Sequence, residues 1–291
     1  MAPAPNGPAE IFGYAIHDTS EEAKAHREAH LCPFTGSMCW KQSRELDVPF
    51  GICTVRYQDE LTATCPSRLL EDKRVFKDIA QLHFGSLDNL MVFSEVGARA
   101  LAQSGSYVTY TFDYVLVKHY PLSAEIEDFV VVEFQTVDTT NTGGLVDAFT
   151  AFQQGTQIQN RKWKFGMNWK NVWKRCFTQI LQKGLVLERW GHKIFWVAQP
   201  SSYRRLKAGY GLGDLSYDPS DSTVFMLYEQ TEVDRGYRLR LVEKTSATAD
   251  GLFRAFQEAT PIPTRSSFMK SLEERVAESS TSELHLRLEM E

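Results

Sequence analysis

Apolar and polar residues alternate in two neighbouring segments near the middle of the chain. In residues 108–117 and 129–137 apolar side chains recur at every second position, which predicts two strands joined by the loop 118–128. The faces of the second strand would carry Val130, Val132 and Phe134 on one side and Val131, Glu133 and Gln135 on the other. The two polar side chains therefore leave the strand together and need not enter the core on the opposite face.

An antiparallel hairpin around this loop pairs Val117 with Phe129 and places Asp113 directly opposite Glu133. Opposed Cβ atoms lie about 4.5–5.5 Å apart, where two like charges destabilise the sheet. Two carboxylates at this spacing need a raised pKa or a cation. A divalent ion with oxygen ligands, Mg²⁺ by preference, would resolve the conflict.

A third carboxylate could join this pair. The spacing of apolar residues predicts a helix over residues 86–105, from a serine N-cap to a terminating glycine, with Glu95 at the edge of its apolar stripe. Without a metal, the carboxylates would instead form a salt-bridged or solvated face, with Lys118 or Arg99 as partners. The alternation alone leaves both interpretations open.

A second amphipathic helix is predicted over residues 169–181, with Gly184 as its end. Its apolar stripe consists of Trp169, Val172, Trp173, Cys176, Phe177, Ile180 and Leu181. Cys176 lies on this stripe and is therefore expected in the core.

The opposite face of this helix is basic, with Lys170, Lys174 and Arg175 among its residues. The surrounding segment 161–193 holds nine lysines and arginines against one glutamate, although the net charge of the chain is −5. Because screening limits each charge to about 8–10 Å, the local sign matters more than the sum. Contact with an anionic partner and a solvated helix face are both open.

Four cysteines lie close together near the N-terminus. Cys32, Cys39, Cys53 and Cys65 fall within 34 residues, and the chain has only one other cysteine. This clustering suggests a tetrahedral metal site of zinc or iron, since a cytoplasmic chain of this size needs no disulfides. The spacing lacks the C-x2-C knuckle of common zinc modules, so buried unbonded thiols are the alternative.

Two other features bear on that site. His26 and His30 are four residues apart, and either could replace one thiolate. Short alternating runs at residues 50–57 and 60–65 predict a hairpin that carries Cys53 and Cys65 on its two strands.

Bulk features exclude a membrane span, because no run of about eighteen consecutive apolar residues occurs. The N-terminal residues MAPAPNGPAE have neither the basic start nor the apolar core of a signal peptide. We therefore expect a cytoplasmic protein.

The order of these motifs resembles the NotI-like restriction endonucleases of the PD-(D/E)XK superfamily. The resemblance is carried by the stretches HLCPFTGSMCW, FGICTVRY, ATCPSRLLED, FDYVLVKH, DFVVVEFQTVDTT and GMNWKNVWKRCFTQILQKG, and covers about residues 10–200. Gln135 stands where the superfamily usually has lysine, a replacement that the NotI-like group shares.

The resemblance implies an α/β (α+β) fold, in which a PD-(D/E)XK core has a mixed central sheet flanked by helices. Residues 1–80 would form an N-terminal extension with a four-cysteine metal-binding subdomain, and residues 81–291 the catalytic and DNA-binding domain. The implied function is that of a bacterial type II restriction endonuclease. It would act as a homodimer and cut double-stranded DNA at a GC-rich palindromic site with Mg²⁺.

The same resemblance implies roles for individual residues. Asp113 and Glu133 would ligate Mg²⁺, Gln135 would help to position the attacking water, and Glu95 would assist. Iron becomes the first choice, ahead of zinc, for the structural metal on the four cysteines. The basic helix face of Lys170, Lys174 and Arg175 would be available for contacts with DNA phosphates.

A non-catalytic DNA-binding protein with a structural cysteine–metal centre is the alternative. In that case the carboxylates would serve as structural pairs, and DNA would be bound with or without Mg²⁺ but never cut.

Overall fold

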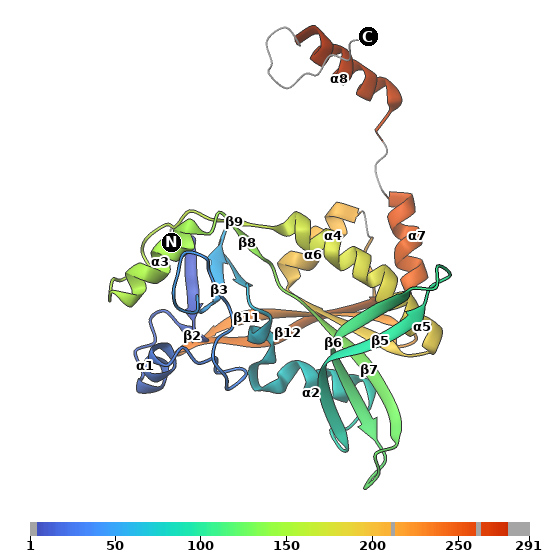
Figure 1. Cartoon of the computed structure of the whole chain (residues 1–291), viewed down its shortest axis with the longest axis horizontal. Helices are drawn as coiled ribbons and strands as arrows, with labels where there is room; N and C mark the ends of the chain where they lie inside the picture. Colours follow the sequence, from blue (N-terminus) through green and yellow to red (C-terminus); the bar gives the residue numbers. More distant parts are fainter. Residues whose placement is uncertain (1–4, 211–212, 260–262, 279–291) are drawn as a thin grey trace.

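A six-stranded mixed sheet forms the centre of the protein (Figure 1). The computed structural model describes residues 5–210, 213–259 and 263–278. The strands are β5 (Leu90–Leu101), β6 (Tyr107–His119), β7 (Ile126–Gln135), β10 (Lys193–Ala198), β11 (Thr223–Val233) and β12 (Gly236–Ala247). They lie in the order β12-β11-β10-β7-β6-β5. The pairs β7–β10 and β10–β11 are parallel, and the other neighbours are antiparallel.

Helices cover both faces of this sheet and complete a three-layer α/β arrangement. The first face packs against α4 (Trp169–Gln179), the π-helical turn η2 (Ile180–Gly184), α5 (Leu185–Trp190), α6 (Pro200–Tyr210) and α7 (Ala249–Ala259). The second packs against the 3₁₀ segment η1 (Pro66–Lys73) and α2 (Arg74–His83). A further helix, α8 (Arg265–Glu278), follows α7 in the chain. Within the described residues, no helix is both long and apolar enough to cross a membrane.

A smaller sheet of order β2-β1-β3-β4 precedes the central one in the chain. Its elements are β1 (Gly7–Ile11), β2 (Tyr14–Ala15), β3 (Ile52–Tyr57) and β4 (Glu60–Ala63), with α1 (Glu21–Glu28) between β2 and β3. Beside it lie α3 (Gly143–Gln153) and the short strand pair β8 (Thr139–Thr140) and β9 (Gly166–Met167). The predicted hairpin of β3 and β4 is confirmed, and Gln58 and Asp59 take the positive φ angles that a tight turn requires.

Two hydrophobic cores cross the predicted boundary at residue 80. Phe76 and Ile79 of α2 pack with the central sheet, whereas Phe149 of α3 packs with Ile52 of the smaller sheet. The division into residues 1–80 and 81–291 stays a prediction.

The hairpin of β6 and β7 has the register that its alternation predicts. Val117 pairs with Phe129, and the ladder continues to Tyr114 opposite Val132. Val131 belongs to the core under α4, whereas Val132 belongs to the core over α2. The predicted division of this strand between two faces is confirmed.

The helix expected over residues 86–105 is wrong, because this segment contains strand β5. β5 is an edge strand that pairs only with β6 among the described strands, and most of its side chains are exposed, including Met91 and Phe93. With neither face fully buried, the strand carries no period-two pattern, and its apolar residues matched a helical spacing by coincidence. Its aromatic and β-branched residues, among them Val92 and Val96, suit a strand better than a helix.

Gly184 does not end the helix that begins at Trp169. The helical path continues through the π-turn into α5 and ends at Gly191, whose φ of 74° is the left-handed conformation of a helix C-cap. A Cβ atom on Gly184 would lie 3.3 Å from the side chain of Ala249 in α7. Gly184 therefore allows close packing of two helical segments.

A buried polar network ties the smaller sheet to the central one. One carboxylate oxygen of Glu10 accepts hydrogen bonds from Arg68 Nε at 2.7 Å, from Gln230 Nε2 at 3.0 Å and from the Thr54 hydroxyl. Arg68 also donates to the carbonyl oxygen of Tyr237 at 2.9 Å, and both charged side chains of the network are fully buried. The network thus joins β1, β3, η1, β11 and β12.

We expect Arg68→Met to lower the free energy of unfolding by about 3–5 kcal/mol, because it leaves Glu10 as an uncompensated buried charge. Urea denaturation followed by circular dichroism measures this loss. The matched control is Arg204→Met, which breaks an exposed pair with Glu60 at 2.5 Å and should cost less than about 1 kcal/mol. Equal losses in both variants would contradict a structural role for the network.

Candidate active site

Three carboxylates lie in one row across three adjacent strands. In the β5–β6 ladder Ser94 pairs with Tyr114 and Val96 with Phe112, so Glu95 lies across from Asp113. Continuing the β6–β7 register places Asp113 across from Glu133. The opposition of Asp113 and Glu133 that the sequence predicts is therefore confirmed, and Glu95 reaches the row from a strand.

Side chains interrupt the backbone ladder along this row. The amide of Asp113 donates to Glu133 Oε1 at 3.2 Å, and the amide of Phe134 donates to Asp113 Oδ2 at 3.0 Å. On the other edge Glu95 has a φ of 53°, which is uncommon for a residue with a side chain. Such local departures from regular backbone often mark functional sites.

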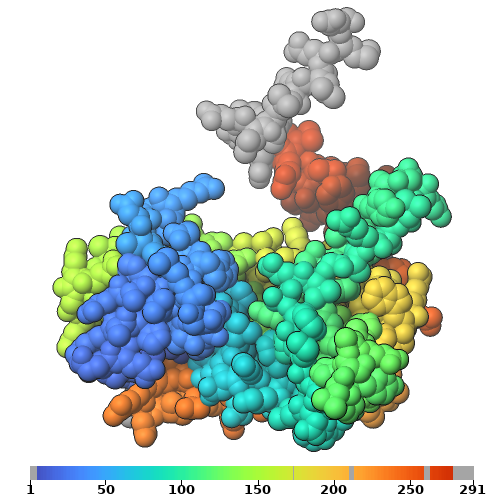
Figure 2. Space-filling model, turned by 60° about the horizontal axis from the view of Figure 1, so that its bottom comes forward, coloured from blue at the N-terminus to red at the C-terminus, as the bar shows by residue number. Residues whose placement is uncertain are grey.

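The row borders a cleft of about 560 Å³. Glu95, Asp113 and Gln135 line one part of it, and Trp40 from the loop after α1 lines another. In the space-filling view, the N-terminal part of the chain in blue and the β5–β6 hairpin in teal to green stand on either side of a hollow (Figure 2). Glu133 lies behind the cleft and is 0% exposed.

Glu133 forms a buried ion pair that the sequence analysis missed. Lys183 Nζ lies 2.6 Å from Glu133 Oε2 and 5.8 Å from the centre of the Phe112 ring. Burial raises the pKa of Glu133 to about 7, with a further increase from the charge of Asp113 and an opposing effect of Lys183. Lys183 thus partly offsets the repulsion between two neighbouring carboxylates.

A signal for Lys183 was present in the sequence. Lysine 183 lies seven residues after Cys176 and three after Ile180, so it continues the apolar stripe of its helix. A lysine on a buried stripe needs a buried partner. Of the two partners that the alternative without a metal named, Lys118 and Arg99, the former is paired with Glu127 at 3.0 Å.

Gln135 lies at the end of β7 and presents an unused acceptor. Its Nε2 donates to Gln179 Oε1 of α4 at 3.3 Å, whereas its own Oε1 is buried without a hydrogen-bond partner in the structure. A buried polar atom of this kind is normally satisfied by water, an ion or a ligand. This orphaned oxygen, next to the carboxylates, fits a site that takes water and a cation.

The donor set fits Mg²⁺, which prefers oxygen ligands. Within the described residues, no three His, Cys, Asp or Glu side chains converge closely enough to hold a metal ion by themselves. Mg²⁺ is usually held by one or two carboxylates together with substrate phosphates, so an open site of this kind suits it.

The basic residues of α4 take different positions. Arg175 lines the cleft and pairs with Asp138 at 3.5 Å, whereas Lys170 and Lys174 are exposed outside its lining. Cys176 on the opposite face is buried in the core, as predicted, and burial raises the pKa of its thiol to about 12.

The four N-terminal cysteines are gathered but do not surround one point. Cys32, Cys53 and Cys65 are buried, Cys39 is half-buried, and none forms a disulfide. Burial raises the pKa of Cys39 and of Cys53, and the charges of Cys65 and Cys32 add to both effects. The thiols thus act on one another electrostatically, and the donor chemistry fits a thiolate metal although their geometry in this structure does not.

Two histidines near these cysteines have other contacts. His26 Nδ1 lies 3.1 Å from the Tyr14 hydroxyl, and the His30 ring lies 5.3 Å from that of Phe12. Their possible role as metal ligands stays a prediction.

We expect Lys183→Met to lower the free energy of unfolding at pH 8 by about 3–5 kcal/mol, because it leaves Glu133 buried and unpaired. Chemical denaturation measures the loss, and the double variant with Glu133→Gln should recover more than half of it. Lys118→Met is the matched control; it removes a partly exposed pair and should cost less than about 1 kcal/mol. A double variant no more stable than Lys183→Met would contradict the coupling.

Comparison with known proteins identifies the family to which the chain belongs. The sequence matches the family model described as Restriction endonuclease NotI over residues 10–208, which is more than half of the chain. None of the curated proteins compared with the chain matches it. The matched range includes the carboxylate row, Gln135, Lys183 and the four cysteines. The chain belongs to the NotI restriction endonuclease family and is a type II site-specific deoxyribonuclease.

Proposed function

We propose that this restriction endonuclease makes Mg²⁺-dependent double-strand cuts in DNA at a GC-rich palindromic site. The observation that carries the proposal is the row of Glu95, Asp113 and Glu133 beside an open cleft. An antiparallel β5–β6–β7 unit that continues into parallel β10 and β11, with helices on both faces, supports a PD-(D/E)XK core. The GC-rich palindrome rests on the family resemblance.

Asp113 and Glu133 would hold the metal ion, with Glu95 assisting from the edge strand. Mg²⁺, when bound, supplies Lewis acidity and lowers the pKa of a bound water. Gln135 Oε1 is free to accept a hydrogen bond from that water and so to orient it. Lys183 is ion-paired with Glu133 and brings a positive charge to the row, whereas the amide of Gln135 is neutral.

A palindromic site and two cut strands favour a homodimer. One row of carboxylates borders the cleft of one chain, whereas a double-strand cut hydrolyses one phosphodiester bond in each strand. Two copies related by a two-fold axis would present one row to each strand of a site with the same symmetry.

We expect Asp113→Asn and Glu133→Gln to abolish Mg²⁺-dependent cleavage, because each removes a negative charge from the row while it keeps a side-chain oxygen acceptor. Plasmid and phage DNA incubated with MgCl₂ and separated on a gel measure cleavage, and electrophoretic mobility shift without Mg²⁺ measures binding. Glu125→Gln, an exposed change in the β6–β7 loop, is the matched control and should cut like the wild type.

The wild type should give discrete fragments, and sequencing of their ends should give a GC-rich palindrome. Retained cleavage by both site variants would refute the assignment of the row. Binding without any cleavage by the wild type would favour the non-catalytic alternative.

We also propose that Cys32, Cys39, Cys53 and Cys65 hold one structural iron or zinc ion. The support is the gathering of four unpaired thiols with mutual electrostatic effects in one part of the N-terminal module. Four thiolates would cross-link the loop after α1 to the β3–β4 hairpin.

We expect about one iron or zinc ion per chain in freshly purified protein, and its loss in Cys53→Ser with a lower thermal midpoint. Elemental analysis by mass spectrometry and a thermal melt measure the two effects. Cys176→Ser is the matched control, since Cys176 is buried in another core and should retain the metal. Wild-type protein without a transition metal would refute this proposal.

A further inference from the structure

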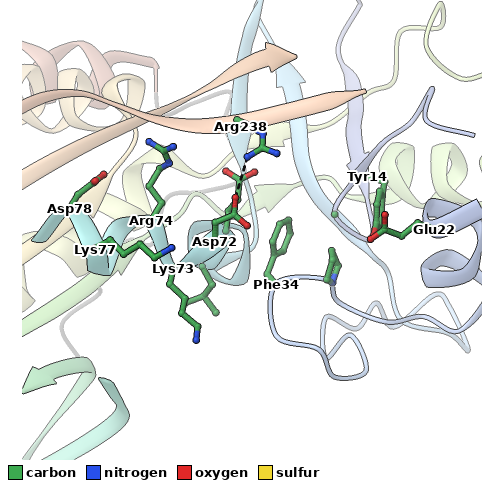
Figure 3. A pocket seen from close by; sticks show the side chains of 13 residues that line it. Tyr14, Glu22, Phe34, Asp72, Lys73, Arg74, Lys77, Asp78 and Arg238 are labelled. Carbon is green, nitrogen blue, oxygen red and sulfur yellow. Dashed lines mark hydrogen bonds and ion pairs between the residues drawn. The ribbon is translucent and has the colours of Figure 1, made fainter. Parts of the chain in front are cut away.

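A second and larger cavity, of about 960 Å³, is lined by none of the three carboxylates of the row. Its walls come from the segment around Tyr14 and Phe34, from the end of η1 with the start of α2, and from Arg238 of β12 (Figure 3). None of the roles given so far uses this cavity.

Each carboxylate that lines the cavity already has a partner within the protein. Glu22 accepts a hydrogen bond from the Tyr14 hydroxyl at 3.1 Å, and Asp78 accepts one from the Tyr228 hydroxyl at 2.8 Å. The other two are Glu71, bound by the Leu239 amide at 2.6 Å and by Arg68, and Asp72, paired with Arg238 at 3.2 Å. Each of these carboxylates thus has a partner other than Lys73, Arg74 and Lys77, although only Glu71 and Asp72 are paired with arginines.

Three cations of the same cavity are uncommitted. Lys73, Arg74 and Lys77 are exposed, and their side chains form no hydrogen bond or ion pair with any residue that the structure describes. They lie within one turn of each other at the start of α2, as Figure 3 shows. The cavity thus offers an anion three positively charged side chains that form no ion pair with the carboxylates of its lining.

An unusual turn presents these cations. Asp72 and Lys73 both take left-handed backbone conformations, with φ angles of 51° and 54°, between η1 and α2. Two consecutive residues with side chains rarely adopt this conformation unless surrounding contacts hold them there. The Asp72–Arg238 pair and the Glu71 contact to β12 are such contacts.

The cavity adjoins the cleft at the carboxylate row. Leu70 lines both, and the consecutive residues Phe34 and Thr35 line the cavity and the cleft, respectively. A ligand that occupies the cleft can therefore continue into this cavity, where it meets Lys73, Arg74 and Lys77. DNA is such a ligand, because its phosphates repeat along the strand on both sides of the bond that is cut.

We propose that Lys73, Arg74 and Lys77 form a binding site for backbone phosphates of duplex DNA that flanks the cut site. This inference rests on the carboxylate cleft as the place of cleavage. The contacts are sequence-independent, since lysine and arginine at phosphates position DNA without reading bases. They would add affinity and orient the duplex across the cleft.

The test is the salt dependence of binding to a 40-base-pair duplex of arbitrary sequence, measured by fluorescence anisotropy in EDTA, where no cleavage occurs. The triple variant Lys73→Gln, Arg74→Gln, Lys77→Gln should lower the slope of log K against log salt by about two to three, because each phosphate contact contributes about 0.9. The single variant Lys77→Gln should lower it by about 0.9. Glutamine keeps a high helix propensity, so α2 should remain folded.

The matched control removes three charges from exposed positions of α8, as Arg265→Gln, Lys270→Gln and Arg275→Gln. Its slope should equal that of the wild type, and an equal decrease in both triple variants would show a general charge effect and overturn the proposal. An unchanged slope in the α2 variants would overturn it as well.

Calorimetric titration with inorganic pyrophosphate tests a small phosphate ligand as the occupant. Saturable, tighter binding of pyrophosphate than of DNA, lost in the α2 triple variant, would overturn the assignment to DNA. Failure of the proposed function is distinguishable, because it appears as absent cleavage by the wild type with Mg²⁺, whereas this inference is measured without Mg²⁺.

Discussion

Repulsion among three carboxylates in one row is the constraint around which the site is arranged. Each member is compensated differently: Glu133 by Lys183, Asp113 by the amide of Phe134, and Glu95 by exposure to solvent. A buried ion pair contributes little net stability compared with well-packed apolar residues. Its presence behind the cleft is therefore better explained by the need to keep a carboxylate in a fixed position than by the stability of the fold.

The hairpin at the centre of the site was predictable although both faces of β7 are buried between residues 130 and 135. The polar Glu133 and Gln135 stand out in an otherwise apolar strand, and a symmetric loop gives the register, so that Asp113 and Glu133 could be paired from the sequence. β5 lacks that burial. Its side chains are mostly exposed, no alternation is imposed on them, and the position of Glu95 on a strand followed only from the ladder with β6.

Lys183 and Gly184 show what local pattern cannot supply. The helical stripe extends to Lys183, but the π-turn that contains it depends on packing between segments, since Gly184 meets Ala249 of α7. The choice of ion-pair partner has the same limit. Lys118 is closer than Lys183 to Asp113 in the sequence, yet it pairs with Glu127, and Lys183 pairs with Glu133. For the cysteines, the sequence predicts that four thiols lie near one another, but it does not predict their mutual geometry, in which they do not surround one point.

The segment η1 lines both the cleft and the second cavity, and a buried network anchors it to the rest of the fold. Arg68 anchors it through Glu10 and the carbonyl of Tyr237. Leu70, two residues later, lines both the cleft and the cavity that contains Lys73, Arg74 and Lys77. The turn that follows is held by β12 through Glu71 and Asp72. Because one buried network positions this shared wall, a duplex that spans both cavities would meet the carboxylate row and the α2 cations in a fixed relation. That relation allows phosphate contacts outside the cleft to align the bond that is cut.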